Sequence, residues 1–341
     1  MTKGELGRAF VPGRTRLPLS GRRQEPDRPE ALSRRQAIGR ALALGLVAAA
    51  AAPAEDPPLP VAEVAPGIFV FHGAHEEATA GNLGGIANLG FVVGAEAVAV
   101  IDTGGSAAEG RRLLAAVRRQ TDLPIRHVID THFHPDHVLG NAAFAGPGTT
   151  IIGHANLPRG LGARADSYMQ GLKDALGDTA AGTAIVPPTL LVRDRLTLDL
   201  GGRSLALKAW PPAHTDADLT VLDTTTGTLF AGDLVFLQRV PAIDGSLRGW
   251  LDAIAGLRRE AGIRQVVPGH GPVAADWPGA LDDEERYLGL ILSETRAALA
   301  AGRSLDQAVA TVGRSERSKW LLFDDYNDRN VATAYTELEW E

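Results

Sequence analysis

The chain of 341 residues contains no cysteine. Disulfides, zinc–thiolate sites and thiol nucleophiles are therefore excluded, and any metal or covalent chemistry must use other side chains. The chain also lacks an uninterrupted run of the roughly 20 apolar residues that a membrane-spanning helix needs, and it shows no tandem repeat of fixed period. Its hydrophobic content of 45% and charged content of 22% are those of an ordinary globular protein.

Basic residues are scarce outside the N-terminal segment. Residues 1–54 carry ten Lys and Arg against four Asp and Glu, so with an overall charge of −7 the rest of the chain carries −13. Nucleic-acid binding needs a basic surface. The acidic body therefore argues against a nucleic acid and leaves a small molecule as the expected partner.

The N-terminal segment has the layout of an export signal. Residues 33–35 read Ser-Arg-Arg, an uncharged run follows at 41–52, and 52–54 read Ala-Pro-Ala. An Arg-rich region, a short apolar core and a small-residue site are typical of a secretory signal, and the adjacent arginines resemble a bacterial twin-arginine signal. We expect residues 1–54 to be a leader and the mature protein to be periplasmic or secreted, without a stable membrane span. An ordinary amphipathic N-terminus is the alternative.

Strand-like and helix-like segments alternate after this leader. We expect a linker at 55–60, a catalytic domain at 61–275, and a helical segment at 276–341 that packs on the same domain. Strands are predicted at 61–71, 85–93, 97–101, 125–129 and 149–152, four times within 183–232, and at 265–267. Helices are predicted at 106–119, 155–176, 249–261 and 280–300. Two groups of strands, each followed by helices, favour a layered α/β/β/α sandwich over a doubly wound sheet.

The most informative segment is Thr131 to His137. It places three imidazoles and one carboxylate directly after the apolar segment 125–129; these are His132, His134, Asp136 and His137. Imidazole and carboxylate are ligands that zinc prefers. Such a cluster is costly unless a metal or solvent takes up its polar groups. The segment therefore predicts a metal site.

Three further candidates each follow an apolar segment: His214, Asp233 and His270. The ends of strands are where an open α/β sheet normally builds its site. Together the motifs resemble those of the metallo-β-lactamase superfamily, and the resemblance spans 61–272. The matching residues are the Ile-Asp-Thr-Gly segment 101–104, His132, His134, Asp136, His137, His214, Asp233 and His270. The resemblance implies an αββα four-layer sandwich.

Carried over residue by residue, the resemblance implies two metal positions. One would be held by His132, His134 and His214. The other would be held by Asp136, His137 and His270. Asp233 would bridge both, since a bridging carboxylate lets two cations sit about 3.5–4 Å apart. Two zinc ions are expected, with Asp136 and Asp233 as the catalytic carboxylates, although iron and manganese suit the same ligands.

The bridging residue narrows the expected chemistry. The β-lactam-hydrolysing classes commonly place Cys or Ser at the position of Asp233, whereas the His/Asp set here resembles glyoxalase II and related thioester or lactone hydrolases. The resemblance implies an exported dinuclear zinc hydrolase whose metal-bound hydroxide attacks an ester-, thioester- or lactam-type carbonyl. A true β-lactamase and a mono-iron persulfide dioxygenase are the alternatives.

A finer resemblance concerns the biological setting. Segments 73–77, 153–157, 244–250, 329–331 and 337–341 resemble exported zinc metallohydrolases of quinoprotein relay systems, whose genes accompany pyrroloquinoline-quinone dehydrogenases and periplasmic cytochromes. This implies a periplasmic quinoprotein dehydrogenase or cytochrome as a partner. It also opens a further alternative, a non-hydrolytic accessory protein of such a system.

Five more residues are candidates for supporting roles. Asp102 would accept a hydrogen bond from a ligand or its backbone, or would merely cap the turn that follows it. Asp218 would bond a ligand imidazole. Arg239 would clamp a substrate carboxylate or phosphate, or form a surface ion pair. His154 and Asn156 would face the cleft.

Two other groups of polar residues have simpler interpretations. The Gly- and Asn-rich loop 72–88 should overhang the site as a lid, and its His72, His75, Glu76 and Glu77 are interpreted as solvated. His127 lies within a buried strand and is interpreted as a core histidine whose polar groups are satisfied.

Overall fold

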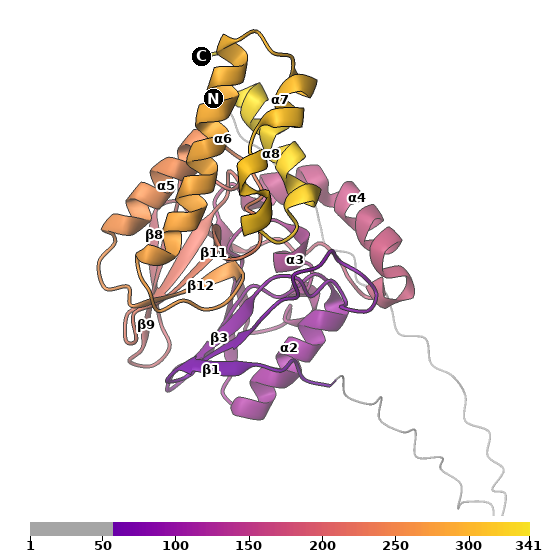
Figure 1. Cartoon of the computed structure of the whole chain (residues 1–341). Coiled ribbons are helices and arrows are strands. Elements are labelled where there is room, and N and C mark those ends of the chain that lie inside the picture. The colour runs from indigo at the N-terminus through magenta and orange to yellow at the C-terminus, as the bar shows by residue number, and fades with distance from the viewer. Residues whose placement is uncertain (1–56) are drawn as a thin grey trace, which may run out of the picture. The chain divides into compact units, whose positions relative to one another are not determined.

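Two mixed β-sheets lie face to face between outer layers of helices (Figure 1). The structure is a computed structural model that describes residues 57–341. The predicted leader, 1–54, and the start of the predicted linker lie outside the described residues. The α/β/β/α sandwich predicted from the sequence is confirmed.

The first sheet has seven strands in the order β1-β2-β3-β4-β5-β6-β7. Its strands are β1 (Ala62–Ala65), β2 (Ile68–Phe71), β3 (Leu89–Val93), β4 (Val98–Ile101), β5 (Ile125–Ile129), β6 (Thr150–His154) and β7 (Leu190–Val192). Neighbours are antiparallel up to β4 and parallel from β4 to β7. The parallel part places the ends of β4 and β5 at the same edge, where the histidine cluster follows.

The second sheet has five strands in the order β12-β11-β10-β9-β8. Its strands are β8 (Arg195–Asp199), β9 (Ser204–Ala209), β10 (Leu219–Asp223), β11 (Thr228–Phe236) and β12 (Gln265–His270). The segment 183–232 was predicted to hold four strands, but five strands begin within it. The extra one is β7, a strand of only three residues that pairs with β6 of the first sheet.

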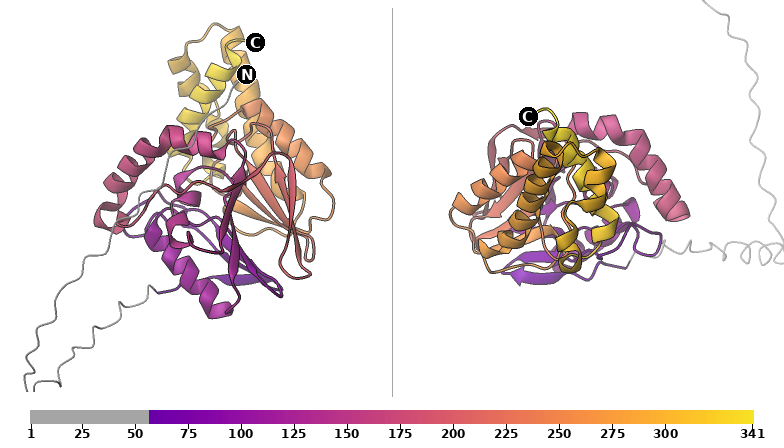
Figure 2. Two further views of the ribbon diagram at one scale, coloured as in Figure 1. Left: turned by 180° about the vertical axis from the view of Figure 1, so that it is seen from behind. Right: turned by 45° about the horizontal axis from the view of Figure 1, so that its top comes forward.

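Helices cover the outer face of each sheet. The helices of the described chain are α2 (Ala107–Gln120), α3 (Pro135–Val138), α4 (Leu157–Leu176), α5 (Leu247–Arg259), α6 (Asp282–Ala300), α7 (Leu305–Thr311) and α8 (Phe323–Leu338). Helix α2 covers the first sheet, α5 and α6 cover the second, and α7 and α8 stack beside α6 (Figures 1 and 2). Ser106 caps α2, its hydroxyl accepting from the Glu109 N–H, while the Glu109 carboxylate accepts from Gly105 N–H.

Strand β4 shows why the apolar runs are nearly continuous. Ala99 and Ile101 face the core between the sheets, whereas Val98 and Val100 face helix α2. Because successive side chains of a strand point to opposite faces, a strand buried on both sides must be apolar throughout.

The C-terminal helices share a core with the second sheet. Trp250 of α5 and Tyr287 of α6 are fully buried, and they belong to one apolar cluster with Val235 of β11 and Val331 of α8. This cluster lies directly behind the residues of β11 and β12 that reach the predicted site.

The end of the predicted linker is attached to the first sheet's helix layer. Leu59 is buried, and its N–H donates to the Arg112 carbonyl of α2. Its side chain packs with the α2 core because it is the apolar residue between two prolines. Among residues 57–341, no helix is long and apolar enough to cross a membrane.

A buried carboxyl on α6 gives the fold a pH dependence. Glu284 is fully buried, and it accepts one hydrogen bond, from Phe236 N–H at 3.0 Å. Burial raises its pKa well above the usual value. The contribution of Glu284 to the free energy of unfolding is therefore greatest below the unfolded-state pKa, near 4.5, and falls as pH rises towards the folded-state pKa.

We predict that Glu284→Gln removes this loss while keeping an acceptor for Phe236. The difference in free energy of unfolding between variant and wild type should grow with pH above 4.5, with a slope of up to about 1.4 kcal/mol per pH unit. Urea unfolding followed by circular dichroism at pH steps from weakly acidic to weakly alkaline measures it. A difference that stays constant over that interval contradicts the assignment.

Candidate metal centre

The histidine cluster forms the connection between β5 and α3. Strand β5 ends at Ile129, and the chain enters α3 at Pro135. Proline suits this first helical position, because its missing N–H would have no partner there. His132 and His134 thus lie on the connection, while Asp136 and His137 lie in the first turn of the helix.

The second sheet supplies the remaining three candidates. His214 lies in the loop after β9, Asp233 lies within β11, and His270 is the last residue of β12. Asp233 was expected just past a strand end, but β11 continues to Phe236. A bulge brings Asp233 to the site: Gly232 has φ +53°, and the pairing of β11 with β12 shifts register on either side of it.

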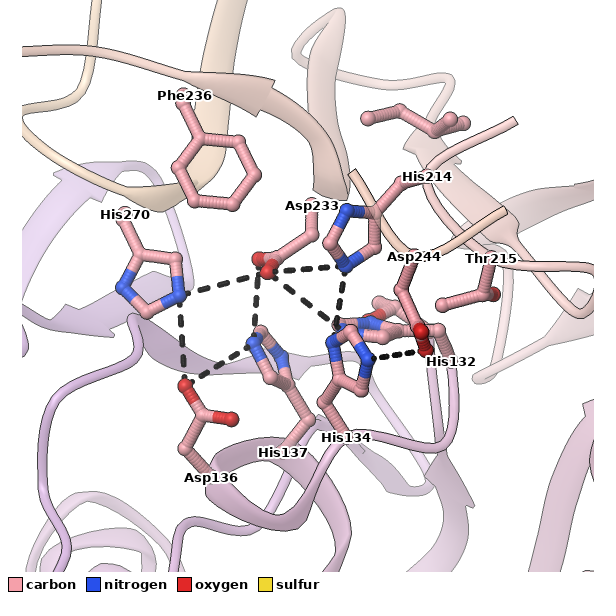
Figure 3. A network of polar contacts seen from close by, with 12 residues as sticks. His132, His134, Asp136, His137, His214, Thr215, Asp233, Phe236, Asp244 and His270 are labelled. Atoms are coloured by element: carbon pink, nitrogen blue, oxygen red, sulfur yellow. Dashed lines mark hydrogen bonds and ion pairs between the residues drawn. The ribbon is translucent and has the colours of Figure 1, made fainter. Parts of the chain in front are cut away.

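The structure brings all seven predicted ligands to one point (Figure 3). They form two groups, and within each group the ligand atoms lie within 4.8 Å of one another. The first group is His132, His134, His214 and Asp233. The second group is Asp136, His137 and His270.

Asp233 lies between the two groups. Its Oδ2 is 3.7 Å from His132 Nε2 and 3.4 Å from His214 Nε2, both in the first group. Its Oδ1 is 3.2 Å from His137 Nε2, and Oδ2 is 3.4 Å from His270 Nε2. This is the arrangement that a bridging carboxylate requires, and Figure 3 shows the carboxylate between both sets of rings.

Glycine at 269 makes room for that carboxylate. A Cβ atom at this position would lie 1.8 Å from Asp233 Oδ1. The backbone of β12 therefore passes too close to the site for any side chain, and only glycine fits.

The outer nitrogens of four imidazoles face oxygen atoms. His137 Nδ1 lies 2.8 Å from Asp102 Oδ2, and His270 Nδ1 lies 2.8 Å from the Ile86 carbonyl. The other two contacts are His132 Nδ1 with Thr131 Oγ1 and His134 Nε2 with Asp244 Oδ2. A hydrogen bond from the outer nitrogen leaves the inner one unprotonated and able to bind a cation.

The inner atoms lack partners that a metal would supply. His132 Nε2, His137 Nε2 and Asp233 Oδ1 are buried, and no group among the described residues forms a hydrogen bond with them. The latter two are 3.2 Å apart but are not aligned as a hydrogen bond. Burial holds the pKa of His132 well below its usual value and lowers that of His214 to about 3. A buried, neutral imidazole without a partner at its inner nitrogen, as in His132, fits a metal site and is costly otherwise.

Asp102 supports this centre by contacting one ligand and the segment that carries the others. Its carboxylate contacts His137 and accepts hydrogen bonds from Thr131 N–H and Thr131 Oγ–H, each at 2.8 Å. The residue has φ +56°, a left-handed conformation that costs energy outside glycine. These three contacts hold Asp102 in that conformation.

Asp218 differs from expectation. It was expected to bond a ligand imidazole, but its carboxylate accepts instead from Thr215 N–H and Thr215 Oγ–H. The nearest ligand, His214, has no hydrogen-bond partner for Nδ1 within the described part of the chain. Its ring is held by packing against Trp250 and Phe236 instead. Asp218 thus shapes the loop that carries His214.

A pocket of about 440 Å³ opens over the two groups. Apolar side chains line it from α3, α4 and β11, and three arginines line it as well; these are Arg164, Arg239 and Arg329. Arg239 lines the pocket and is buried, and it also forms a loose ion pair with the exposed Glu77 at 4.0 Å.

His154 and Asn156 lie outside this pocket. They were expected to face the cleft. His154 instead ends β6, and its Nδ1 accepts from Asn156 N–H, while the Asn156 amide donates to the Asp216 carbonyl. The two residues therefore stabilise the turn from β6 into α4.

Sequence reasoning missed three residues at this site. Asp244 contacts His134, Arg164 of α4 bonds Asp244 at 3.1 Å, and Tyr326 of α8 lines the pocket. No local pattern points to the Asp244 contact, because the two residues are 110 positions apart. A loop of polar residues just after Asp233 was the one available signal.

A family model supports the same conclusion. The model described as the metallo-beta-lactamase superfamily matches residues 83–281, more than half of the chain. The chain belongs to the metallo-beta-lactamase superfamily. It carries two groups of His and Asp residues that could each hold a metal ion.

Relatives of known sequence cover only part of the chain. It is 28% identical over 157 residues to a linear primary-alkylsulfatase of a Pseudomonas strain, covering 43% of this chain and 28% of that protein. It is 30% identical over 154 residues to the uncharacterized protein YobT of Bacillus subtilis, covering 43% of this chain and 63% of that one. The chain thus spans less than two thirds of either relative.

Similar solved structures support the fold. The sec-alkylsulfatase Pisa1 from Pseudomonas sp. matches 82% of this chain and 50% of its own, with a TM-score of 0.62 and 14% identity. The mono-zinc form of the metallo-beta-lactamase FIM-1 from Pseudomonas aeruginosa matches 69% of this chain and 96% of its own, with a TM-score of 0.52 and 19% identity.

The two ligand groups are expected to bind their metal ions independently of each other. Wild-type protein should hold close to two divalent ions per chain, and His134→Ala and His270→Ala should each hold about one, because each removes a ligand of a different group. His127→Ala is the control, since His127 lies on β5 outside both groups. Elemental analysis of the purified proteins gives the stoichiometry. Two ions retained in both ligand variants would contradict the assignment.

Proposed function

We propose that the protein is a dinuclear zinc hydrolase that cleaves an ester-, thioester- or lactam-type carbonyl bond of a small amphipathic substrate. The observation that carries this proposal is the position of Asp233 between the two ligand groups. Its carboxylate oxygens lie 3.2–3.7 Å from imidazole nitrogens on both sides. Bound divalent cations supply electrophilic activation and a nucleophile at neutral pH.

The residues of the chain fix the geometry of this reaction. Asp102 and Asp244 orient the rings of His137 and His134 through their outer nitrogens. The Asp136 side chain is 15% exposed and lines the pocket, whereas that of Asp233 is 4% exposed. Asp136 is therefore the carboxylate placed to accept a hydrogen bond from an attacking water and orient it, while Asp233 holds the two groups in register.

The pocket favours an amphipathic substrate. Leu139, Leu172 and Leu176 form part of its wall, and Phe236 lies between His270 and Trp250, stacking on His270 at 5.0 Å. An apolar wall beside a polar centre buries the chain of a ligand while polar groups fix its reacting end.

Sulfate-ester cleavage is the second candidate. The 28% identity to a linear primary-alkylsulfatase favours it, because that relative acts on a substrate with an apolar chain and an anionic ester. The arginines of the pocket would suit the sulfate group, since guanidinium donors match oxyanion acceptors. The same ligand groups would serve either reaction.

A substrate panel distinguishes the two reactions. Hydrolysis of lactones, thioesters, phenyl esters and β-lactams should be measured beside that of alkyl sulfates. We expect turnover of a carbonyl substrate that falls at least 100-fold after removal of metal with a chelator and returns on addition of zinc. His134→Ala should show the same loss. Turnover of alkyl sulfates alone would establish the second candidate, and no turnover in a metal-loaded protein would favour the accessory role.

We also propose that the protein is exported by the twin-arginine route and acts beside periplasmic quinoprotein oxidation. The layout of residues 1–54 and the finer resemblance of the segments quoted above support this proposal. When the full chain is expressed in a bacterium with that route, Arg34→Lys together with Arg35→Lys should retain the protein in the cytoplasm. N-terminal sequencing of the periplasmic form should begin near Glu55. A full-length, cytoplasmic wild-type protein would overturn the proposal.

A further inference from the structure

Three residues from distant parts of the chain meet at one side of the pocket. Tyr326 of α8 donates its hydroxyl proton to Glu77 Oε1 at 2.7 Å. Arg239, which follows β11, donates to the same hydroxyl at 2.7 Å. All three line the pocket beside His270 and Asp233. The loop 72–88, the β11 connection and the C-terminal helix are thus joined through one phenol group.

Arg239 has donors that this contact leaves available. Its Nη1 lies 3.3 Å from His270 Nδ1. That nitrogen faces the Ile86 carbonyl at 2.8 Å, so its proton is directed there and it cannot accept from Arg239. Within residues 57–341, the oxygens near the guanidinium are Tyr326 Oη and the Glu77 carboxylate, the latter at 4.0 Å. A guanidinium carries five N–H donors and is costly to bury without an anion.

Glu77 is a weak partner for the Arg239 guanidinium. Its side chain is 60% exposed, whereas that of Arg239 is 4% exposed. An ion pair with one solvated partner at this distance contributes little. The Glu77 carboxylate therefore lies in the pocket, next to the buried guanidinium of Arg239. Because Glu77 belongs to a surface loop, a competing anion would displace its carboxylate at a small cost in free energy.

We propose that Glu77 occupies the place of an anionic group of the substrate, and that Arg239 and Tyr326 receive that group when the Glu77 carboxylate leaves. The shared chemistry is a carboxylate or sulfonate-type oxyanion carried on an apolar chain. The C-terminal helix α8 thereby determines substrate specificity through Tyr326, with Arg329 on the same pocket wall. The proposal rests on the proposed function only in taking this pocket as the substrate site.

Binding of non-reacting probes tests it without turnover. Octanoate, octanesulfonate and the neutral octanamide should be titrated calorimetrically into the metal-loaded protein. Glu77→Gln keeps an acceptor for Tyr326 and removes the competing charge, so it should bind the anionic probe about two- to fivefold more tightly and leave octanamide unchanged. Arg239→Gln should lower the affinity for the anionic probe about tenfold or more. The two anionic probes distinguish a carboxylate from a sulfate-like group.

Glu76→Gln is the matched control. Glu76 is the neighbouring acid on the same loop, bonds Asn82, and does not line the pocket. Removing its charge should leave the affinity of all probes within the error of the measurement. An equal gain in both glutamine variants would show a general charge effect and overturn the proposal. So would octanoate and octanesulfonate affinities that do not change in Glu77→Gln. Hydrolysis by the wild-type protein would stand in either case, so the two proposals fail separately.

Discussion

The burial of one carboxylate between five imidazoles is the constraint on which the rest of the structure depends. Asp233 comes from the second sheet, whereas His132 and His137 lie in the connection and helix that follow strand β5 of the first. Their polar atoms are buried, so they are stable only if the sheets meet at the right separation and cations balance them. The centre therefore fixes how the two halves of the sandwich align. Metal affinity and folding stability are coupled in such a site.

The sequence predicted this centre because its His and Asp motifs are visible without knowledge of the fold and, as a set, resemble those of the superfamily. Most of these ligands follow or end an apolar segment, whereas Asp233 lies within β11. Strand β5 has the predicted bounds, and the histidine cluster follows it directly. The contact of Asp244 with His134 was not predictable, because it depends on how a long loop returns to the site. Likewise His154 and Asn156 lie at the end of a strand, as the ligands do, but their hydrogen bonds hold their side chains in the turn between β6 and α4. The position of a residue along a strand places it at an edge of the sheet but does not determine where its side chain points.

The segment after the last ligand, His270, is part of the same architecture. Helices α6 and α8 share an apolar cluster with α5 and β11. Trp250 in that cluster packs against the His214 ring, whose Nδ1 has no hydrogen-bond partner among residues 57–341. Packing thus replaces a polar contact in orienting this ligand. The C-terminal helices thereby support the centre from behind and contribute to the pocket in front of it.

The close approach of Gly269 to Asp233 has an evolutionary consequence. A methyl group at 269 would overlap Oδ1, and it would also lie 2.8 Å from the carbonyl carbon of Gly232 and 2.9 Å from the Asp233 amide nitrogen. The restriction on position 269 therefore comes from the backbone of β11 as well as from the bridging carboxylate. A descendant that replaced Asp233 would still need glycine at 269, so this glycine would outlast the ligand set that it accommodates.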